Sequence, residues 1–176
     1  MDKKGRMLLH TCCGPCASAS VERLIEDGWA VDLFFSNSNI FPGDEYLKRL
    51  EGAVRTAEYF GVRCLEDSYQ HEQWLKVISG LENEPERGKR CLQCFNYSLK
   101  RTSKKAAEEG YDGFATSLTI SPHKPAGAIF EIGKTTANFI EYDFKKRNGF
   151  KRSIELSKEM GLYRQSYCGC EFSMRS

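Results

Sequence analysis

The sequence predicts a single α/β domain in which helices cover a parallel β-sheet. Short apolar runs, which are typical of buried strands, alternate along the chain with longer segments whose apolar residues recur at helical spacing. The length of 176 residues is about that of one domain, and 40% hydrophobic residues suffice for one core. No internal repeat, low-complexity tract or linker divides the chain, so residues 1–176 are expected to form one unit.

The first half of the chain predicts three strands and two helices. Short apolar runs predict strands at residues 7–11 (MLLHT), 30–36 (AVDLFFS) and 62–66 (VRCLE). Apolar residues on one face and a glycine at the end predict helices at residues 17–27, before Gly28, and at residues 47–61. The turn-rich segment NSNIFPGD precedes the second helix.

The second half predicts four helices and one strand. Helical spacing marks residues 71–81, 91–109, 126–140 and 152–160, with the charged loop ENEPERGKR between the first two. The run GFATSL, residues 113–118, predicts the fourth strand. This alternation of strands and helices is what places the predicted strands parallel.

Three thiols follow the first predicted strand directly. The segment LLHTCCGPCAS carries Cys12, Cys13 and Cys16, and in an open α/β sheet ligands bind outside the carboxyl ends of the strands. The segment has none of the phosphate-binding patterns GxGxxG, GxxxxGK[ST] or SGGxDS. Because a helix N-terminus favours thiolate over thiol, these cysteines suit a metal site or a reactive sulfur.

Two further pairs of thiols have the spacing of ligands. Cys91 and Cys94 in RCLQCF share one face at the start of a predicted helix. Cys168 and Cys170 in YCGC point the same way if the segment is extended, and Gly169 allows a close approach of the backbone. The alternative for Cys91 and Cys94 is a pair of small buried residues.

Seven clustered thiols exceed the four that one zinc ion or one iron-sulfur cluster takes. More than one metal is therefore expected. Since adjacent side chains diverge, we expect Cys12 and Cys13 to serve two different metals. Cys16 is a ligand, a neighbour of the ligands or merely a small residue, and Cys64 is expected to be a packing residue in a strand.

The sequence resembles the QueH-type epoxyqueuosine reductase family. Five segments, in this order, carry the resemblance: LLHTCCGPC, SNSNIFPGDEYLKR, PERGKRCLQCF, FATSLTISPHKP and YDFKKRNGFKRSIELSKEMGLYRQSYCGCEFS. The resemblance implies a Rossmann-like fold of the PP-loop (HUP) type and reduction of epoxyqueuosine to queuosine at the wobble position of tRNA, the final step of queuosine biosynthesis. It also implies a [4Fe-4S] cluster with an additional mononuclear iron, and no use of cobalamin. The C-terminal tail, residues 162–176, is then expected to close the metal site.

The resemblance guides an assignment of ligands. Cys91 and Cys94 are expected to bind the cluster, joined by one of Cys12 and Cys13 and by one of Cys168 and Cys170. The other two cysteines would hold the lone iron with Asp143, which follows a short apolar stretch and is expected at another strand end. Cys12, Cys13 and Asp143 are therefore the expected catalytic residues. The alternative for Asp143 is a solvated loop acid or a helix cap.

Positive charge and aromatic residues suggest where RNA would bind. Residues 87–105 contain seven Lys or Arg and no acid, and residues 145–165 contain seven against two acids, although such runs are often only solvated faces. The expected substrate wall consists of Tyr163, Arg164, Gln165 and Tyr167, whose alternative is core packing of the two tyrosines. His10 is expected in the core and His123 on the surface.

The sequence shows neither a secretory signal nor an apolar run long enough for a membrane span. A cytoplasmic enzyme with no membrane partner and with an unidentified electron donor is therefore expected. Two rival functions remain: a zinc-stabilised RNA-binding module without catalysis, and an ATP-using tRNA sulfur transferase. The missing pyrophosphate loop argues against the second rival.

Overall fold

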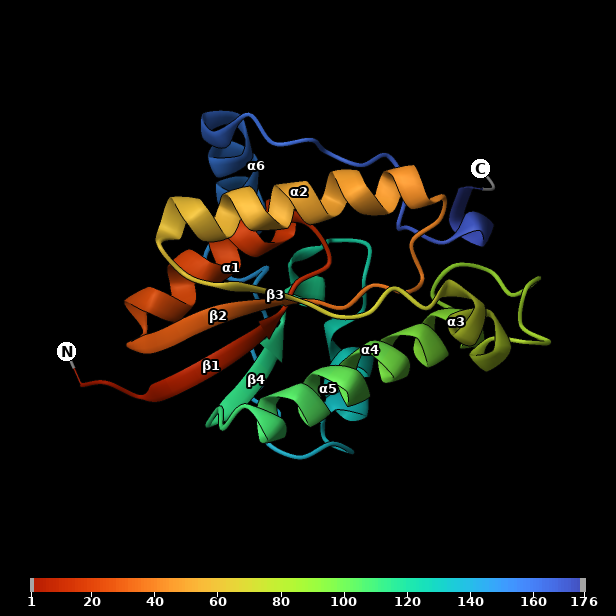
Figure 1. Cartoon of the computed structure of the whole chain (residues 1–176), viewed down its shortest axis with the longest axis horizontal. Coiled ribbons are helices and arrows are strands. Elements are labelled where there is room, and N and C mark those ends of the chain that lie inside the picture. Colours follow the sequence, from red (N-terminus) through yellow and green to blue (C-terminus); the bar gives the residue numbers. More distant parts are fainter. Residues whose placement is uncertain (1, 175–176) are drawn as a thin grey trace.

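Four parallel strands in the order β3-β2-β1-β4 form the central sheet (Figure 1). The computed structural model describes residues 2–174, so residues 1, 175 and 176 of the predicted domain and tail lie outside the described residues. The strands are β1 (Gly5–His10), β2 (Trp29–Phe35), β3 (Cys64–Glu66) and β4 (Gly113–Thr116). The predicted α/β fold with a parallel sheet is confirmed.

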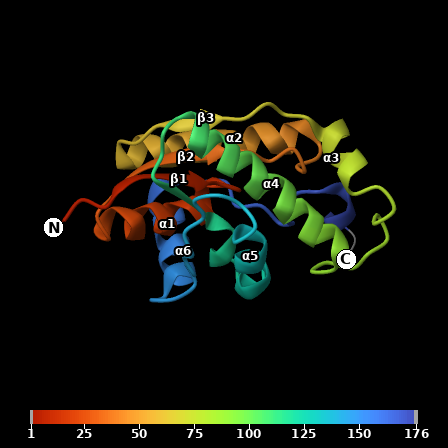
Figure 2. The same ribbon diagram turned by 90° about the horizontal axis from the view of Figure 1, so that it is seen from below.

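Helices cover both faces of this sheet. They are α1 (Gly14–Glu26), α2 (Gly43–Phe60), α3 (His71–Val77), α4 (Lys89–Glu108), α5 (Ala126–Gly133) and α6 (Gly149–Met160). Two short 3₁₀ helices, η1 (Ser117–Ile120) and η2 (Glu171–Met174), complete the described elements. Figures 1 and 2 show α1, α2 and α6 on one face and α4 and α5 on the other.

The alternation of side chains along β1 builds a core on each face. Met7 and Leu9 pack with residues of α1 and α6, whereas Leu8 packs with Phe95 and Leu99 of α4. All of these side chains are buried. Because β1 is buried on both faces, its sequence is a continuous apolar run.

The connections place a crevice at the ends of β1 and β4. The chain leaves β1 into α1 on one face, while its neighbour β4 leads through η1 to α5 on the other. Adjacent parallel strands whose connections run to opposite faces form a topological switch point, where α/β proteins bind their ligands. The first cysteine segment lies at this point.

The predicted helix at residues 126–140 is wrong beyond Gly133. The chain turns at Asn138, which has a φ of 65°, and Phe139 then forms a parallel bridge with Phe114 of β4. A Cβ on Gly133 would lie 2.3 Å from the Phe139 ring, so the segment folds back tightly on α5. Apolar spacing alone does not separate a helix from an apolar strand-like segment that packs beside it.

Smaller boundary differences have local causes. The predicted strand 113–118 ends at Thr116, whose hydroxyl accepts a hydrogen bond from the Leu118 amide and starts η1. Helix α1 begins at Gly14, three residues before its prediction, with Pro15 in its first turn. No helix within residues 2–174 is long and apolar enough to cross a bilayer.

Candidate metal centre

The first group of thiols lies between the end of β1 and the first turn of α1. The sulfur atoms of Cys12, Cys13 and Cys16 all lie within 4.8 Å of one another. Cys13 is the N-cap of α1, and its sulfur accepts a hydrogen bond from the Cys16 amide at 3.4 Å. Gly14 allows α1 to start here, because a Cβ at this residue would lie 2.6 Å from the Gly52 carbonyl oxygen of α2.

The expectation that the side chains of Cys12 and Cys13 diverge is wrong. Their sulfur atoms are 4.0 Å apart, whereas two thiolates on one tetrahedral ion with bonds of about 2.3 Å stand roughly 3.8 Å apart. The extended backbone of Cys13, with φ −168° and ψ 166°, precedes the helical turn that brings Cys16 to the same place. The bend between strand and helix therefore offsets the alternation expected in a straight strand.

Proton sharing within this group concentrates negative charge on one sulfur. Hydrogen bonds from the thiols of Cys13 and Cys16, with further help from the Lys124 ammonium, lower the pKa of Cys12 well below its usual range. Giving its hydrogen bond to Cys12 raises the pKa of Cys13 to about 12. Removing the second and third protons therefore needs a nearby positive charge, and a bound metal ion is one way to supply it.

The second group of thiols faces the first across a cavity. Cys91 and Cys94 lie in the first two turns of α4, where the Arg87 amide donates a hydrogen bond to the Cys91 sulfur at 3.3 Å. Burial first, and then the charges of Cys168 and Cys170, raise the pKa of Cys94. The two pairs of thiols that are far apart in the sequence are thus electrostatic neighbours.

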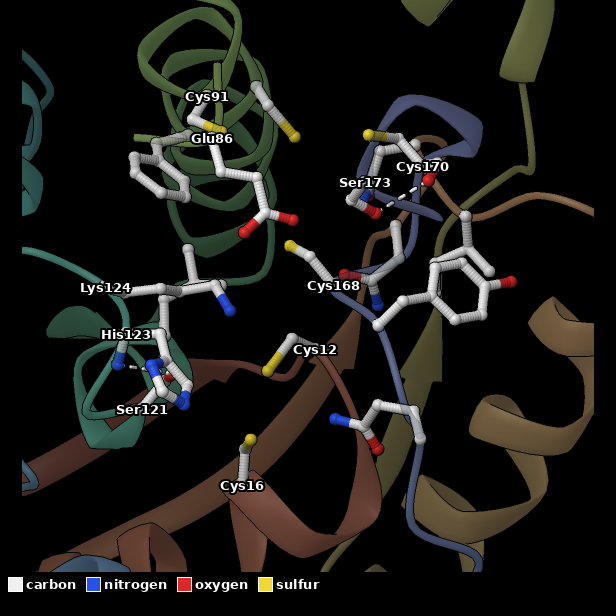
Figure 3. A pocket seen from close by; sticks show the side chains of 18 of the residues that line it. Cys12, Cys16, Glu86, Cys91, Ser121, His123, Lys124, Cys168, Cys170 and Ser173 are labelled. Atoms are coloured by element: carbon white, nitrogen blue, oxygen red, sulfur yellow. Dashed lines mark hydrogen bonds between the residues drawn. The ribbon is translucent and has the colours of Figure 1, made fainter. Parts of the chain in front are cut away.

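A cavity of about 420 Å³ joins the two groups. Six thiols line it: Cys12, Cys16, Cys91, Cys94, Cys168 and Cys170. Figure 3 shows the Cys168 sulfur between Cys12 and the helix that carries Cys91. Residues of the tail up to Ser173 line this cavity, and that they close a metal site stays a prediction.

Two residues of helix α2 hold the tail at the cavity. Arg49 is buried, forms an ion pair with Glu45 at 3.1 Å, and donates hydrogen bonds to the Cys168 and Tyr167 carbonyl oxygens at 2.6 and 2.9 Å. The Tyr163 hydroxyl donates to Glu45 at 2.7 Å. The positions of Cys168 and Cys170 therefore depend on a buried ion pair that is distant in the sequence.

The predicted substrate wall is divided by the structure. Arg164, Gln165 and Tyr167 line the cavity, whereas Tyr163 lies on the outer side against Glu45. The Gln165 amide nitrogen donates to the Cys13 sulfur at 3.1 Å, and its buried amide oxygen has no hydrogen-bond partner among the described residues. That oxygen is available to accept a hydrogen bond from a bound molecule.

Asp143 lies apart from the thiols. Its carboxylate accepts a hydrogen bond from the Lys145 amide at 3.1 Å and stands 3.6 Å from the Lys145 ammonium, and it does not line the cavity. The Lys145 ammonium in turn donates to the Thr119 carbonyl oxygen at 2.8 Å. The strand end expected before Asp143 is reduced to the single bridge at Phe139.

Besides Arg49, two charged residues in the cavity, Glu86 and Lys124, were not foreseen. Figure 3 shows the Glu86 carboxylate and the Lys124 ammonium pointing into it. Burial opposes the charge of Lys124, but the negative charges of Cys168 and Cys12 raise its pKa. The only signal in the sequence that could have identified them is their position in the chain. Glu86 shortly precedes Cys91 and Cys94, and Lys124 lies in the segment that follows β4 and η1.

The remaining predicted residues are placed as follows. His10 is buried and hydrogen-bonded to Thr116 at 2.8 Å and to the Ser36 carbonyl at 3.1 Å, so its core position is confirmed. Cys64 packs against the core in β3, as expected. His123 is exposed as expected but also lines the cavity.

Comparison with known proteins gives one consistent result. The family model described as epoxyqueuosine reductase QueH matches residues 7–176. A protein of that name from Streptococcus pyogenes serotype M1 is 39% identical over 180 residues, covering 96% of this chain and 70% of that protein. Those from Acinetobacter baylyi and Thermotoga maritima are 37% and 34% identical, covering 99% and 97% of this chain and 83% and 91% of theirs.

Proposed function

Because the chain belongs to the epoxyqueuosine reductase QueH family, we propose that it is an iron-sulfur oxidoreductase that reduces epoxyqueuosine to queuosine in tRNA without cobalamin. The observation that carries the proposal is the meeting of six cysteines from three distant segments on one cavity. Loss of the epoxide oxygen as water takes two electrons and two protons and leaves an alkene. A bound iron centre would supply the electrons and a Lewis acid for the departing oxygen.

The donor atoms fit two metal sites. Thiolates are the ligands of iron-sulfur clusters, and the helical pair with the two tail cysteines offers the four that a cluster takes. We assign Cys91, Cys94, Cys168 and Cys170 to the cluster. Cys12, Cys13 and Cys16 are close enough to hold the lone iron together, which replaces the expectation that Cys12 and Cys13 are divided between the metals.

The chain's own residues would bind and orient the modified base. The Lys124 ammonium carries a proton and a positive charge beside Cys12 and Cys168, where it favours negative charge that develops on a departing oxygen. Gln165 offers its free amide oxygen, and Tyr167 offers an aromatic ring that also lines the cavity. Tyr167 is itself fixed by a hydrogen bond to the Phe41 carbonyl oxygen at 2.5 Å.

Anaerobic reconstitution tests the proposal. Protein supplied with iron and sulfide should become brown. It should bind about five irons per chain, four in the cluster and one alone, in two Mössbauer environments. When reduced by dithionite, it should convert epoxyqueuosine in tRNA. A colourless protein that retains stoichiometric zinc and converts nothing would favour the RNA-binding module instead.

Turnover on tRNA should fall steeply as salt is added, because cations that hold phosphates release counterions. Arg101 and Lys105 of α4, and Arg152 of α6, form ion pairs within the chain and are poor candidates for this contact. Among the cations that line the cavity, Arg87 and Arg164 are exposed and are the better candidates for this contact. Rates should be compared between 50 and 200 mM salt, about the range over which such contacts weaken; unchanged turnover would point to the free nucleoside as substrate.

Replacing Asp143 separates its predicted role as an iron ligand from a role in holding Lys145. From its contacts we expect Asp143→Asn to keep the full iron content, because its carboxylate pairs with Lys145 behind the loop that carries Lys124. If Asp143 acts by holding Lys145, Asp143→Asn and Lys145→Met should reduce turnover to a similar extent, and both variants should retain their iron. Loss of about one iron per chain in Asp143→Asn alone would show that the carboxylate is a ligand after all.

A further inference from the structure

Trp74 of helix α3 has a buried hydrogen-bond donor without an acceptor. Its side chain is fully buried, and the indole nitrogen has no hydrogen-bond partner among the described residues. Native proteins rarely bury a donor without a partner, and such an exception calls for an explanation. Trp29, the other tryptophan, follows the rule, since its indole nitrogen donates to the Tyr142 hydroxyl at 3.0 Å.

Two stacked rings, His71 and Phe172, fix the orientation of the Trp74 ring. Its centroid lies 5.6 Å from the His71 ring and 6.4 Å from the Phe172 ring, with interplanar angles of 18° and 26°. His71 is held in turn by hydrogen bonds to the Ser38 carbonyl oxygen at 2.8 Å and to Glu171 at 3.1 Å. The direction of the indole N–H is therefore set before any ligand binds.

One candidate acceptor beside the same small core is the sulfur of Cys94. Cys94 packs against the same small core as Trp74, Ile78 and Cys170, and both Trp74 and Cys94 line the cavity. A neutral thiol is a weak acceptor, but a thiolate accepts strongly. The donor thus matches the sulfur only in its charged, ligand form.

We propose that Trp74 donates an N–H···S hydrogen bond to the Cys94 thiolate when this sulfur holds the iron-sulfur cluster, and thereby raises the reduction potential of that cluster. The inference rests on the proposed function, because it concerns the same metal centre. Hydrogen bonds to ligand sulfurs favour the more electron-rich reduced state. Trp74 is on this account a positioning residue that acts on electron transfer through Cys94.

The test compares Trp74→Phe with Ile78→Val. The first keeps a buried aromatic ring and removes the N–H, while the second trims the same core and leaves the N–H in place. Iron content and visible absorption are measured first, followed by an anaerobic redox titration monitored by electron paramagnetic resonance. Trp74→Phe should lower the potential by a tenfold change in the one-electron equilibrium, about 59 mV, whereas Ile78→Val should keep that of the unsubstituted protein.

A second measurement needs no substitution at Trp74. Protein with ¹⁵N in its indole rings should show a ¹⁵N coupling to the reduced cluster in pulsed electron paramagnetic resonance, and Trp29→Phe should retain it. If protein with a full iron content lacks this coupling, or if Trp74→Phe with a full iron content has an unchanged potential, the role of Trp74 is overturned but the proposed function is not. A chain that takes up no iron and sulfide overturns the proposed function and this inference together.

Discussion

Replacing Cys91 or Cys94 by Ala should abolish or strongly reduce the visible absorption of the reconstituted protein and its reduction of epoxyqueuosine. The two sulfurs lie in the first two turns of α4 and face the tail cysteines across the cavity. Because a cluster is held by thiolate ligands, loss of one weakens assembly and loss of both removes half of the assigned set. Absorption after anaerobic reconstitution and iron content per chain are the measurements.

Cys64→Ala provides the matched control. Cys64 is also a half-buried cysteine, but it packs against the core in β3 and does not line the cavity. Its replacement should leave iron content and turnover unchanged. If the double variant Cys91→Ala/Cys94→Ala instead keeps a full cluster and normal turnover, both residues leave the ligand set, and the cluster must be held by the cysteines of the first group and the tail.

Replacing Arg49 by Met should release the tail and disable the metal centre although no ligand is changed. The side chain is 2% exposed and bonds both carbonyl oxygens beside the Cys168 segment. Its loss leaves Glu45 buried without a cation, and breaking such a pair from one side costs about 3–5 kcal/mol. Hydrogen exchange of residues 163–172 should become faster, and iron content and turnover should fall together.

Arg55→Met is the control for this prediction. Arg55 lies on the same helix and also donates to backbone carbonyl oxygens, those of Met160 and Gly161, but it is exposed and touches no cysteine segment. We expect a loss of stability of at most about 1 kcal/mol and an unchanged iron content. An Arg49→Met protein with normal exchange in the tail and full iron would show that the tail is held by other contacts.

The fold was largely predictable because its signals are local. Met7, Leu8 and Leu9 read as a buried strand since β1 is covered on both faces, and the glycines at 28 and 61 marked helix ends. The prediction failed at residues 134–140, where Phe139 and Ile140 continue an apolar pattern but pair with β4. Which apolar segment joins the sheet depends on the neighbour that it meets, and that neighbour is distant in the sequence.

Spacing within each cysteine segment, by itself, identified the thiols, their three groups and the place of the first group at a strand end, because CxxC and CxC geometry is local. Only the tertiary structure decided that Cys12, Cys13 and Cys16 converge, that the pairs 91/94 and 168/170 share one cavity, and that Asp143 stands apart with Lys145. The same holds for Arg49 beneath the tail and Trp74 beside Cys94. The convergence of Cys12, Cys13 and Cys16 depends on the bend between β1 and α1, which spacing alone does not reveal. The other contacts between the cysteine segments, Arg49 and Trp74 join residues about twenty to more than one hundred positions apart, and packing of helices on the sheet brings them within reach.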